Sequence, residues 1–128
     1  CKPSRGHWLY LSESALVEVT ATLCRMVREN PPRLTLATRE RLLALFQGHV
    51  QNSYHIIPTS RDRYVHAADL CRSHPLRAYD AVQLACALAA RDDALSAGLT
   101  PPTFVCADAV LLGVAAAEGL AVENPNDH

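Results

Sequence analysis

The sequence predicts an α/β fold in which a central parallel sheet lies between two layers of helices. Short segments rich in aromatic and aliphatic residues alternate with longer segments whose apolar residues recur every three to four positions. Strands separated by helices pair in parallel, and a parallel sheet needs cover on both faces. With 128 residues, 49% of them hydrophobic, the chain is long enough to form one domain with its own core.

The expected elements follow the order β-α-α-β-α-α-β-α-β. Their approximate bounds are strands at 8–12, 54–57, 103–106 and 120–123, and helices at 14–29, 38–47, 59–72, 79–92 and 109–118.

Periodicity and breakers define the elements of the first half. The first strand is rich in aromatic residues, and the helix after it repeats apolar residues at Leu16, Val19 and Leu23. The Asn-Pro-Pro segment that includes Pro31 ends this helix, because the residue before a proline disfavours helical geometry. We expect Gly48 to close the second helix.

In the second half, Pro58 ends the second strand, and Thr59 with Asp62 fits a capping-box-like helix start. Gly119 is expected to stop the last helix, and the tail 124–128 is expected to fray.

The segment at 76–88, with the sequence LRAYDAVQLACAL, is the most informative in the chain. Between residues 80 and 90 only Asp80 and Gln83 are polar, so the helix is expected to be buried on most of its sides. A carboxylate at the edge of such a helix is costly to desolvate unless a cation or a hydrogen-bond donor contacts it.

Composition excludes several classes of protein. The net charge of −1 predicts no strong non-specific attraction to nucleic acid, and no apolar run is long enough for a membrane span. The five cysteines form no CxxC pair, four of them lie in apolar segments, and the histidines form no zinc motif. The polar first residues show no signal peptide. We therefore expect a cytoplasmic protein.

Three acids map to the carboxyl edge of the expected sheet, where open α/β sheets bind ligands. They are Glu18, Asp80 and Asp108. Each also has a structural explanation, since Asp80 and Asp108 suit helix N-termini and Glu18 could be an exposed helical residue. If the three meet, they would repel one another and would form an oxygen-ligand site for Mg²⁺ or Mn²⁺. Such a site suits phosphodiester hydrolysis by metal-activated water.

The chain resembles the PIN-domain ribonucleases, most closely the VapC-type toxins of toxin–antitoxin pairs. The resemblance covers nearly the whole chain, and the segments that carry it are SALVEV at 14–19, HPLRAYDAVQLA at 74–85, FVCAD at 104–108 and AEGLAVENP at 117–125. It implies a three-layer α/β/α fold, metal-dependent cleavage of RNA, an antitoxin partner and a homodimer. It also implies that Glu18, Asp80 and Asp108 are the catalytic metal ligands.

The chain departs from the family pattern in two places. The family begins with a central strand that ends in a further metal-binding Asp, and this chain has no counterpart, so we expect an N-terminally incomplete PIN-like domain. Cys106 stands where the family often has a Ser or Thr that helps to order the site.

RNA binding would require arginines near the acids. Eleven of the twelve basic residues are arginine, which suits bidentate phosphate contacts but also fits genome bias. The candidates are Arg77, Arg61 and Arg63, each of which could instead be a solvated surface residue. A PIN-like module without catalytic activity that binds a protein is the main alternative function, and a DNA-directed nuclease is a third.

Overall fold

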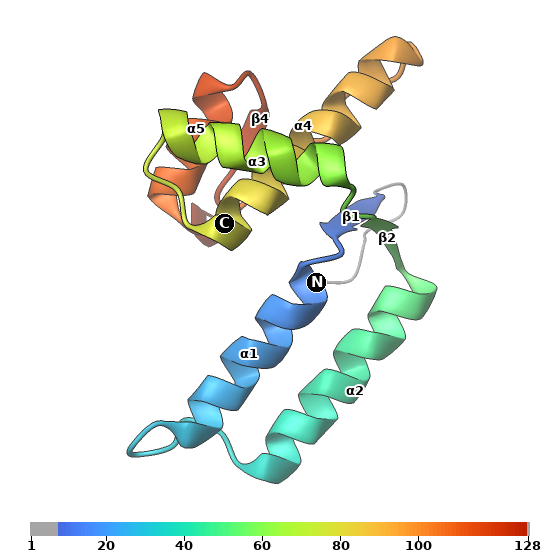
Figure 1. Ribbon diagram of the computed structural model, residues 1–128. Coiled ribbons are helices and arrows are strands. Elements are labelled where there is room, and N and C mark those ends of the chain that lie inside the picture. Colours follow the sequence, from blue (N-terminus) through green and yellow to red (C-terminus); the bar gives the residue numbers. More distant parts are fainter. Residues whose placement is uncertain (1–7, 128) are drawn as a thin grey trace. The chain divides into compact units, whose positions relative to one another are not determined.

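The computed structural model describes residues 8–127, which form five α-helices, four short strands and one 3₁₀ turn (Figure 1). The strands are β1 (Leu9–Ser12), β2 (Tyr54–Ile57), β3 (Thr103–Val105) and β4 (Ala121–Glu123). The helices are α1 (Ala15–Arg28), α2 (Leu36–Asn52), α3 (Arg61–Ser73), α4 (Ala78–Ser96) and α5 (Ala109–Ala117), followed by the 3₁₀ turn Pro125–Asp127.

The chain divides into two compact units, unit 1 (Cys1–Ile57) and unit 2 (Pro58–His128). In unit 1, β1 and β2 pair in parallel, with Leu9 opposite Tyr54 and Ser12 opposite Ile57. Parallel strands cannot be joined by a tight turn, and here the helices α1 and α2 make the connection (Figure 1).

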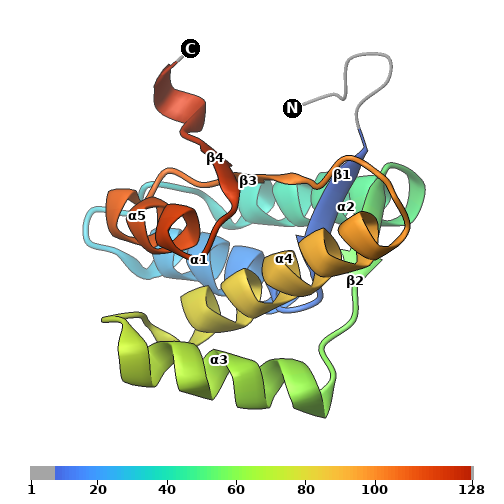
Figure 2. The same cartoon turned by 90° about the horizontal axis from the view of Figure 1, so that it is seen from above.

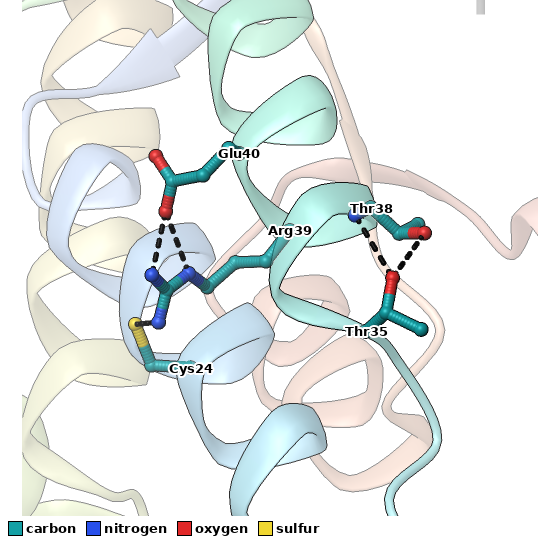
Figure 3. Close-up of polar contacts among 5 residues, drawn as sticks. All are labelled: Cys24, Thr35, Thr38, Arg39 and Glu40. Carbon is teal, nitrogen blue, oxygen red and sulfur yellow. Dashed lines mark hydrogen bonds and ion pairs between the residues drawn. The ribbon is translucent and has the colours of Figure 1, made fainter.

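Polar contacts hold the turns and helix ends of unit 1. The buried hydroxyls of Ser12 and Ser14 lie 2.6 Å apart where β1 leads into α1. At the start of α2, the Thr35 hydroxyl accepts a hydrogen bond from the Thr38 amide at 3.1 Å, which satisfies one of the free donors of the first turn (Figure 3).

Arg39 connects the two helices of unit 1. Its guanidinium donates to the Glu40 carboxylate and contacts the Cys24 sulfur of α1 at 4.0 Å (Figure 3). A guanidinium offers several donors in a fixed plane, so one side chain can serve a carboxylate and a thiol together.

In unit 2, α3 packs along α4, and β3 pairs in parallel with β4 through the crossover helix α5 (Figure 2). Thr103 lies opposite Ala121, and Val105 lies opposite Glu123. Among residues 8–127, every apolar side chain that is buried belongs to this unit, and these residues are Ala67, Leu70, Ala81, Val82, Leu84, Ala85, Cys86, Leu88, Leu111, Val114, Ala115 and Leu120.

The apolar helix α4 supplies half of that core, as the sequence predicts. Leu84 and Cys86 are the largest side chains that lose essentially all contact with solvent. Gln83 is half-buried on the same helix. Burial of a Leu side chain contributes about 1.5–3 kcal/mol, so α4 is the main source of hydrophobic stabilisation in unit 2.

Two glycines with positive φ close the helices of unit 2. Gly119 has φ +85°, the Leu120 amide donates to the Ala115 carbonyl at 3.0 Å, and the Gly119 amide donates to Ala116. This pair of bonds is a Schellman motif, whose left-handed residue is usually glycine. Gly98, with φ +69°, ends α4 in the same way. The end of α5 follows the sequence prediction, whereas α4 continues to Ser96, beyond its predicted end at residue 92.

The order and type of all nine elements are confirmed, and both strand pairs are parallel. The structure is a helix-rich α/β protein with two small sheets of two strands, one in each unit, where the sequence predicts one central sheet.

Several local predictions are wrong. Helix α2 passes through Gly48 and ends at Asn52, whose side-chain amide donates to the Gly48 carbonyl at 2.8 Å. The helix α3 is capped by Ser60, whose hydroxyl accepts from the Arg63 amide, and not by Thr59. Residues 125–127 of the tail form a 3₁₀ turn, and His128 lies outside the described residues.

The cysteine prediction holds in part. The four described cysteines are free thiols; Cys86 is buried, Cys24 and Cys106 are half-buried, and Cys71 is exposed. Cys1 lies outside the described residues. Within residues 8–127, we find no helix with the length and apolar character needed to cross a membrane.

Replacement of Leu84 by Ala should lower the free energy of unfolding by about 2–5 kcal/mol. The side chain is fully buried in the core of unit 2, so its removal would leave a cavity there. Denaturant unfolding measures this. The matched control is Leu95→Ala in the same helix, where Leu95 is 57% exposed and the change should be small. Similar losses at both positions would contradict the assigned core.

Replacement of Gly48 by Ala should stabilise the protein by about 0.5–1 kcal/mol, because the position is helical and an added Cβ meets no atom within 4 Å. The control is Gly119→Ala, where the left-handed backbone and the Arg91 guanidinium, 3.3 Å from an ideal Cβ, should make the same change destabilising. Thermal unfolding of the two variants would show opposite shifts, and a loss of stability in Gly48→Ala would contradict the helical assignment.

Candidate functional site

Asp80 lies in the first turn of α4, at the mouth of the buried helix. The side chain is half-buried, and the helix begins after Arg77, which occupies the N-cap position without a side-chain cap. An acid in the first turn interacts favourably with the helix dipole. The position of Asp80 at a helix N-terminus thus agrees with the structural role that the sequence suggests.

Asp108 is the N-cap of α5. Its Oδ1 accepts hydrogen bonds from the backbone amides of Val110 at 2.8 Å and Leu111 at 3.0 Å. The Cys106 sulfur accepts a bond from the Asp108 amide at 3.3 Å, so the thiol helps to hold the turn between β3 and α5. Both cap bonds use one oxygen of Asp108, and the exposed carboxylate keeps a second oxygen for another ligand.

The two carboxylates interact electrostatically. Burial raises the pKa of Asp80 above its ordinary value of 3.8, the negative charge of Asp108 raises it further, and the positive charge of Arg77 lowers it in part. The structure therefore brings Asp80 and Asp108 within range of each other, at the N-termini of two helices in the same unit. A like charge near a carboxylate favours its protonated form.

The three candidate arginines differ in availability. Arg77 is exposed, and its positive charge lowers the pKa of Asp80. Arg61 is exposed as the first residue of α3. Arg63 is half-buried, and its Nη1 donates to the Pro58 carbonyl at 2.5 Å while its Nε is buried without a hydrogen-bond partner. Arg63 thus has a local role at the start of α3, and Arg77 has the best position for a ligand at the acidic pair.

Glu18 belongs to unit 1. It lies in the first turn of α1, and its side chain is half-buried. The Glu18 amide donates to the Ser14 carbonyl at 3.1 Å, which begins the helix.

The donor set of the Asp80–Asp108 pair fits a hard divalent cation. Within residues 8–127, no group of three or more His, Cys, Asp or Glu side chains is arranged to hold a metal ion. Two carboxylates are nevertheless compatible with Mg²⁺, which keeps several waters and commonly binds through one or two carboxylates and the phosphates of a substrate.

Sequence reasoning missed a second polar cluster in unit 2. His74 Nε2 and Glu118 Oε1 lie 2.7 Å apart, and Arg91 Nη1 donates to the Glu118 carbonyl at 2.6 Å. These contacts join residues 44 and 27 positions apart. The local sequence carries only a weak signal, a His before Pro75 and a Glu before Gly119 at helix ends, which does not indicate that they meet.

The comparisons with known proteins add no relative. A search of family models finds no match to the chain, and neither the curated proteins nor the solved structures give a significant match.

Asp80 should destabilise the folded protein near neutral pH. An acid whose pKa is raised in the native state binds its proton more tightly in the folded than in the unfolded protein. Protonation of Asp80 therefore stabilises the folded protein at low pH, and this stabilisation is lost as the pH rises through the raised pKa. Replacement of Asp80 by Asn should therefore increase stability relative to the native sequence at about pH 7, and the advantage should vanish at about pH 3. Urea unfolding at both pH values measures it.

The control for this prediction is Asp69→Asn. Asp69 is an exposed acid on α3 that pairs with Arg72, so its replacement should give no such gain as pH rises. A stability difference between Asp80→Asn and the native protein that does not depend on pH would contradict the raised pKa.

Proposed function

We propose that the protein is a metal-dependent endoribonuclease with a three-layer PIN-like fold, and that it acts as the toxin of a toxin–antitoxin pair in the cytoplasm. The observation that carries this proposal is the Asp80–Asp108 pair, two acids at helix N-termini whose charges interact. The sequence resemblance that assigns both residues to a metal site supports it independently.

The chemistry of the pair suits phosphodiester hydrolysis. Bound Mg²⁺ or Mn²⁺ would supply Lewis acidity and an activated water at a phosphate. Asp80 and the second oxygen of Asp108 would hold the ion, while Oδ1 of Asp108 keeps its bonds to Val110 and Leu111. The helix N-termini beside both acids would favour the negative charge of a phosphate.

Glu18 is the third proposed ligand. The sequence resemblance to the PIN-domain ribonucleases supports this assignment. Glu18 would act on the metal directly or through a water molecule.

Single-stranded or looped RNA is the proposed substrate, because its unstacked bases are accessible to a protein. Arg77, exposed and close enough to Asp80 to affect its charge, would contact the phosphate beside the scissile bond. Arg61 would bind further along the strand, while Arg63 contributes less because its guanidinium already contacts the backbone.

An antitoxin and a second copy of the chain are the proposed protein partners. Apolar residues on the surface of α2 support this part, since Leu36 and Leu45 are 60% and 55% exposed. Leu42 and Phe46 of the same helix are half-buried.

One observation favours the alternative of an inactive PIN-like binding module. The Asp108 carboxylate already has a structural role as the cap of α5, so its presence requires no metal.

Replacement of Asp80 by Asn should abolish Mn²⁺-dependent RNA cleavage, with a loss of at least about a hundredfold, because metal stabilisation of the transition state is worth several kcal/mol. Asp108→Asn should have the same effect while its amide oxygen preserves the helix cap. Cleavage of a fluorescent RNA and Mn²⁺ binding by calorimetry would measure activity and affinity separately.

The control is Asp69→Asn, which removes an exposed acid from α3 and should leave both measurements unchanged. If the native protein binds no Mn²⁺ and cuts no RNA, the binding module becomes the better reading, and cleavage of single-stranded DNA alone would identify a DNA-directed nuclease.

A further inference from the structure

We infer that the contact between His74 and Glu118 is a positioning contact, which sets the separation of the two carboxylates at the N-termini of α4 and α5. His74 lies in the segment that leads into α4, six residues before Asp80. Glu118 follows the last residue of α5, ten residues after Asp108. The contact thus joins the segment before Asp80 to the C-terminal end of α5, whose N-terminus carries Asp108.

The contact between the two side chains is short and partly shielded from water. His74 Nε2 and Glu118 Oε1 are 2.7 Å apart, and the side chains keep only 23% and 34% of their exposure. A carboxylate at a helix C-terminus interacts unfavourably with the helix dipole unless a hydrogen-bond donor or a cation contacts it. His74 supplies that donor for Glu118 from outside the helix.

Arg91 holds the same residue from α4. Its Nη1 donates to the Glu118 carbonyl at 2.6 Å, which satisfies a carbonyl at the end of α5, and its Nε donates to Asp92 at 2.9 Å. The next residue, Gly119, leaves room for this guanidinium, since an ideal Cβ there would lie 3.3 Å from Nη1. Glu118 therefore connects α5 to α4 through its backbone and to the segment before α4 through its side chain.

The segment between His74 and α4 is itself held by short-range bonds. The His74 amide donates to the Leu70 carbonyl, and the Leu76 amide donates to the His74 carbonyl, both at 2.8 Å. The helix then begins with the Ala81 amide bonded to the Arg77 carbonyl. Backbone hydrogen bonds therefore connect His74 to the segment that begins α4.

Helix α5 connects Glu118 with Asp108. Its nine residues span about 14 Å at 1.5 Å per residue, and it is capped by Asp108 at one end and by the Gly119 motif at the other. A short helix closed at both ends moves as one body, so a shift at Glu118 also moves Asp108. The charge of Asp108 disfavours the charge of Asp80, and the His74–Glu118 contact holds the far end of α5 against the segment that leads into α4.

This inference rests on the carboxylate pair of the proposed function, and its test has one readout that needs no metal. The readout is the backbone amide signal and hydrogen exchange of Val110 and Leu111, which bond to Asp108, and of Ala81 beside Asp80. The second readout is Mn²⁺ affinity. The variants are Glu118→Ala and His74→Ala, which remove the contact, and Glu118→Gln and His74→Gln, which keep an acceptor and a donor.

We expect both alanine variants to shift the Val110, Leu111 and Ala81 signals and to weaken Mn²⁺ binding about tenfold, the range found when groups that orient metal ligands are removed. The glutamine variants should keep most of the native signals and affinity. Asp69→Ala, which removes an exposed acid that pairs with Arg72, is the matched control and should change neither readout.

The inference is overturned if the alanine variants change only signals near positions 74–77 and 117–120, because the contact would then be local. If Glu118→Ala fails to fold, the His74→Ala and His74→Gln comparison gives the same decision. Absence of Mn²⁺ binding in the native protein would contradict the proposed function alone, since the amide readout still tests the positioning contact.

Discussion

Burial of α4 is the constraint on which the rest of unit 2 depends. The helix is apolar on most of its circumference, and α3 packs along it. The charged residues of α4 lie near its two ends: Asp80 in the first turn, and Arg91, Asp92 and Asp93 towards the C-terminus. Of these, Asp80 and Arg91 take part in the polar clusters of the unit.

The N-termini of α4 and α5 each place an acid where the helix itself favours negative charge. For Asp108 this interaction is a complete cap with two backbone bonds. For Asp80 it is insufficient, because burial and the charge of Asp108 raise its pKa. A stability cost at a partly buried acid such as Asp80 is a pattern that functional sites commonly show, since a charge that disfavours folding can bind a cation or activate a substrate.

The two units are stabilised in different ways. Unit 2 buries a continuous set of aliphatic side chains. Among the described residues of unit 1, the buried side chains are the polar pair Ser12 and Ser14, and Arg39 of α2 contacts the Cys24 sulfur of α1. Apolar residues such as Tyr10, Val17 and Leu45 remain exposed on unit 1.

The sequence by itself determined the order of the elements, their helix or strand type and most of their ends, because periodicity, proline and glycine act within a few residues of the chain. It also placed Asp80 and Asp108 at helix N-termini. It failed at Gly48, where the cost of one glycine was too small to stop α2 and the Asn52 side chain supported the next turn. Only the tertiary structure decided that Asp80 and Asp108 interact and that His74 meets Glu118, since these contacts join residues 28 and 44 positions apart and depend on how α4 packs with its neighbours.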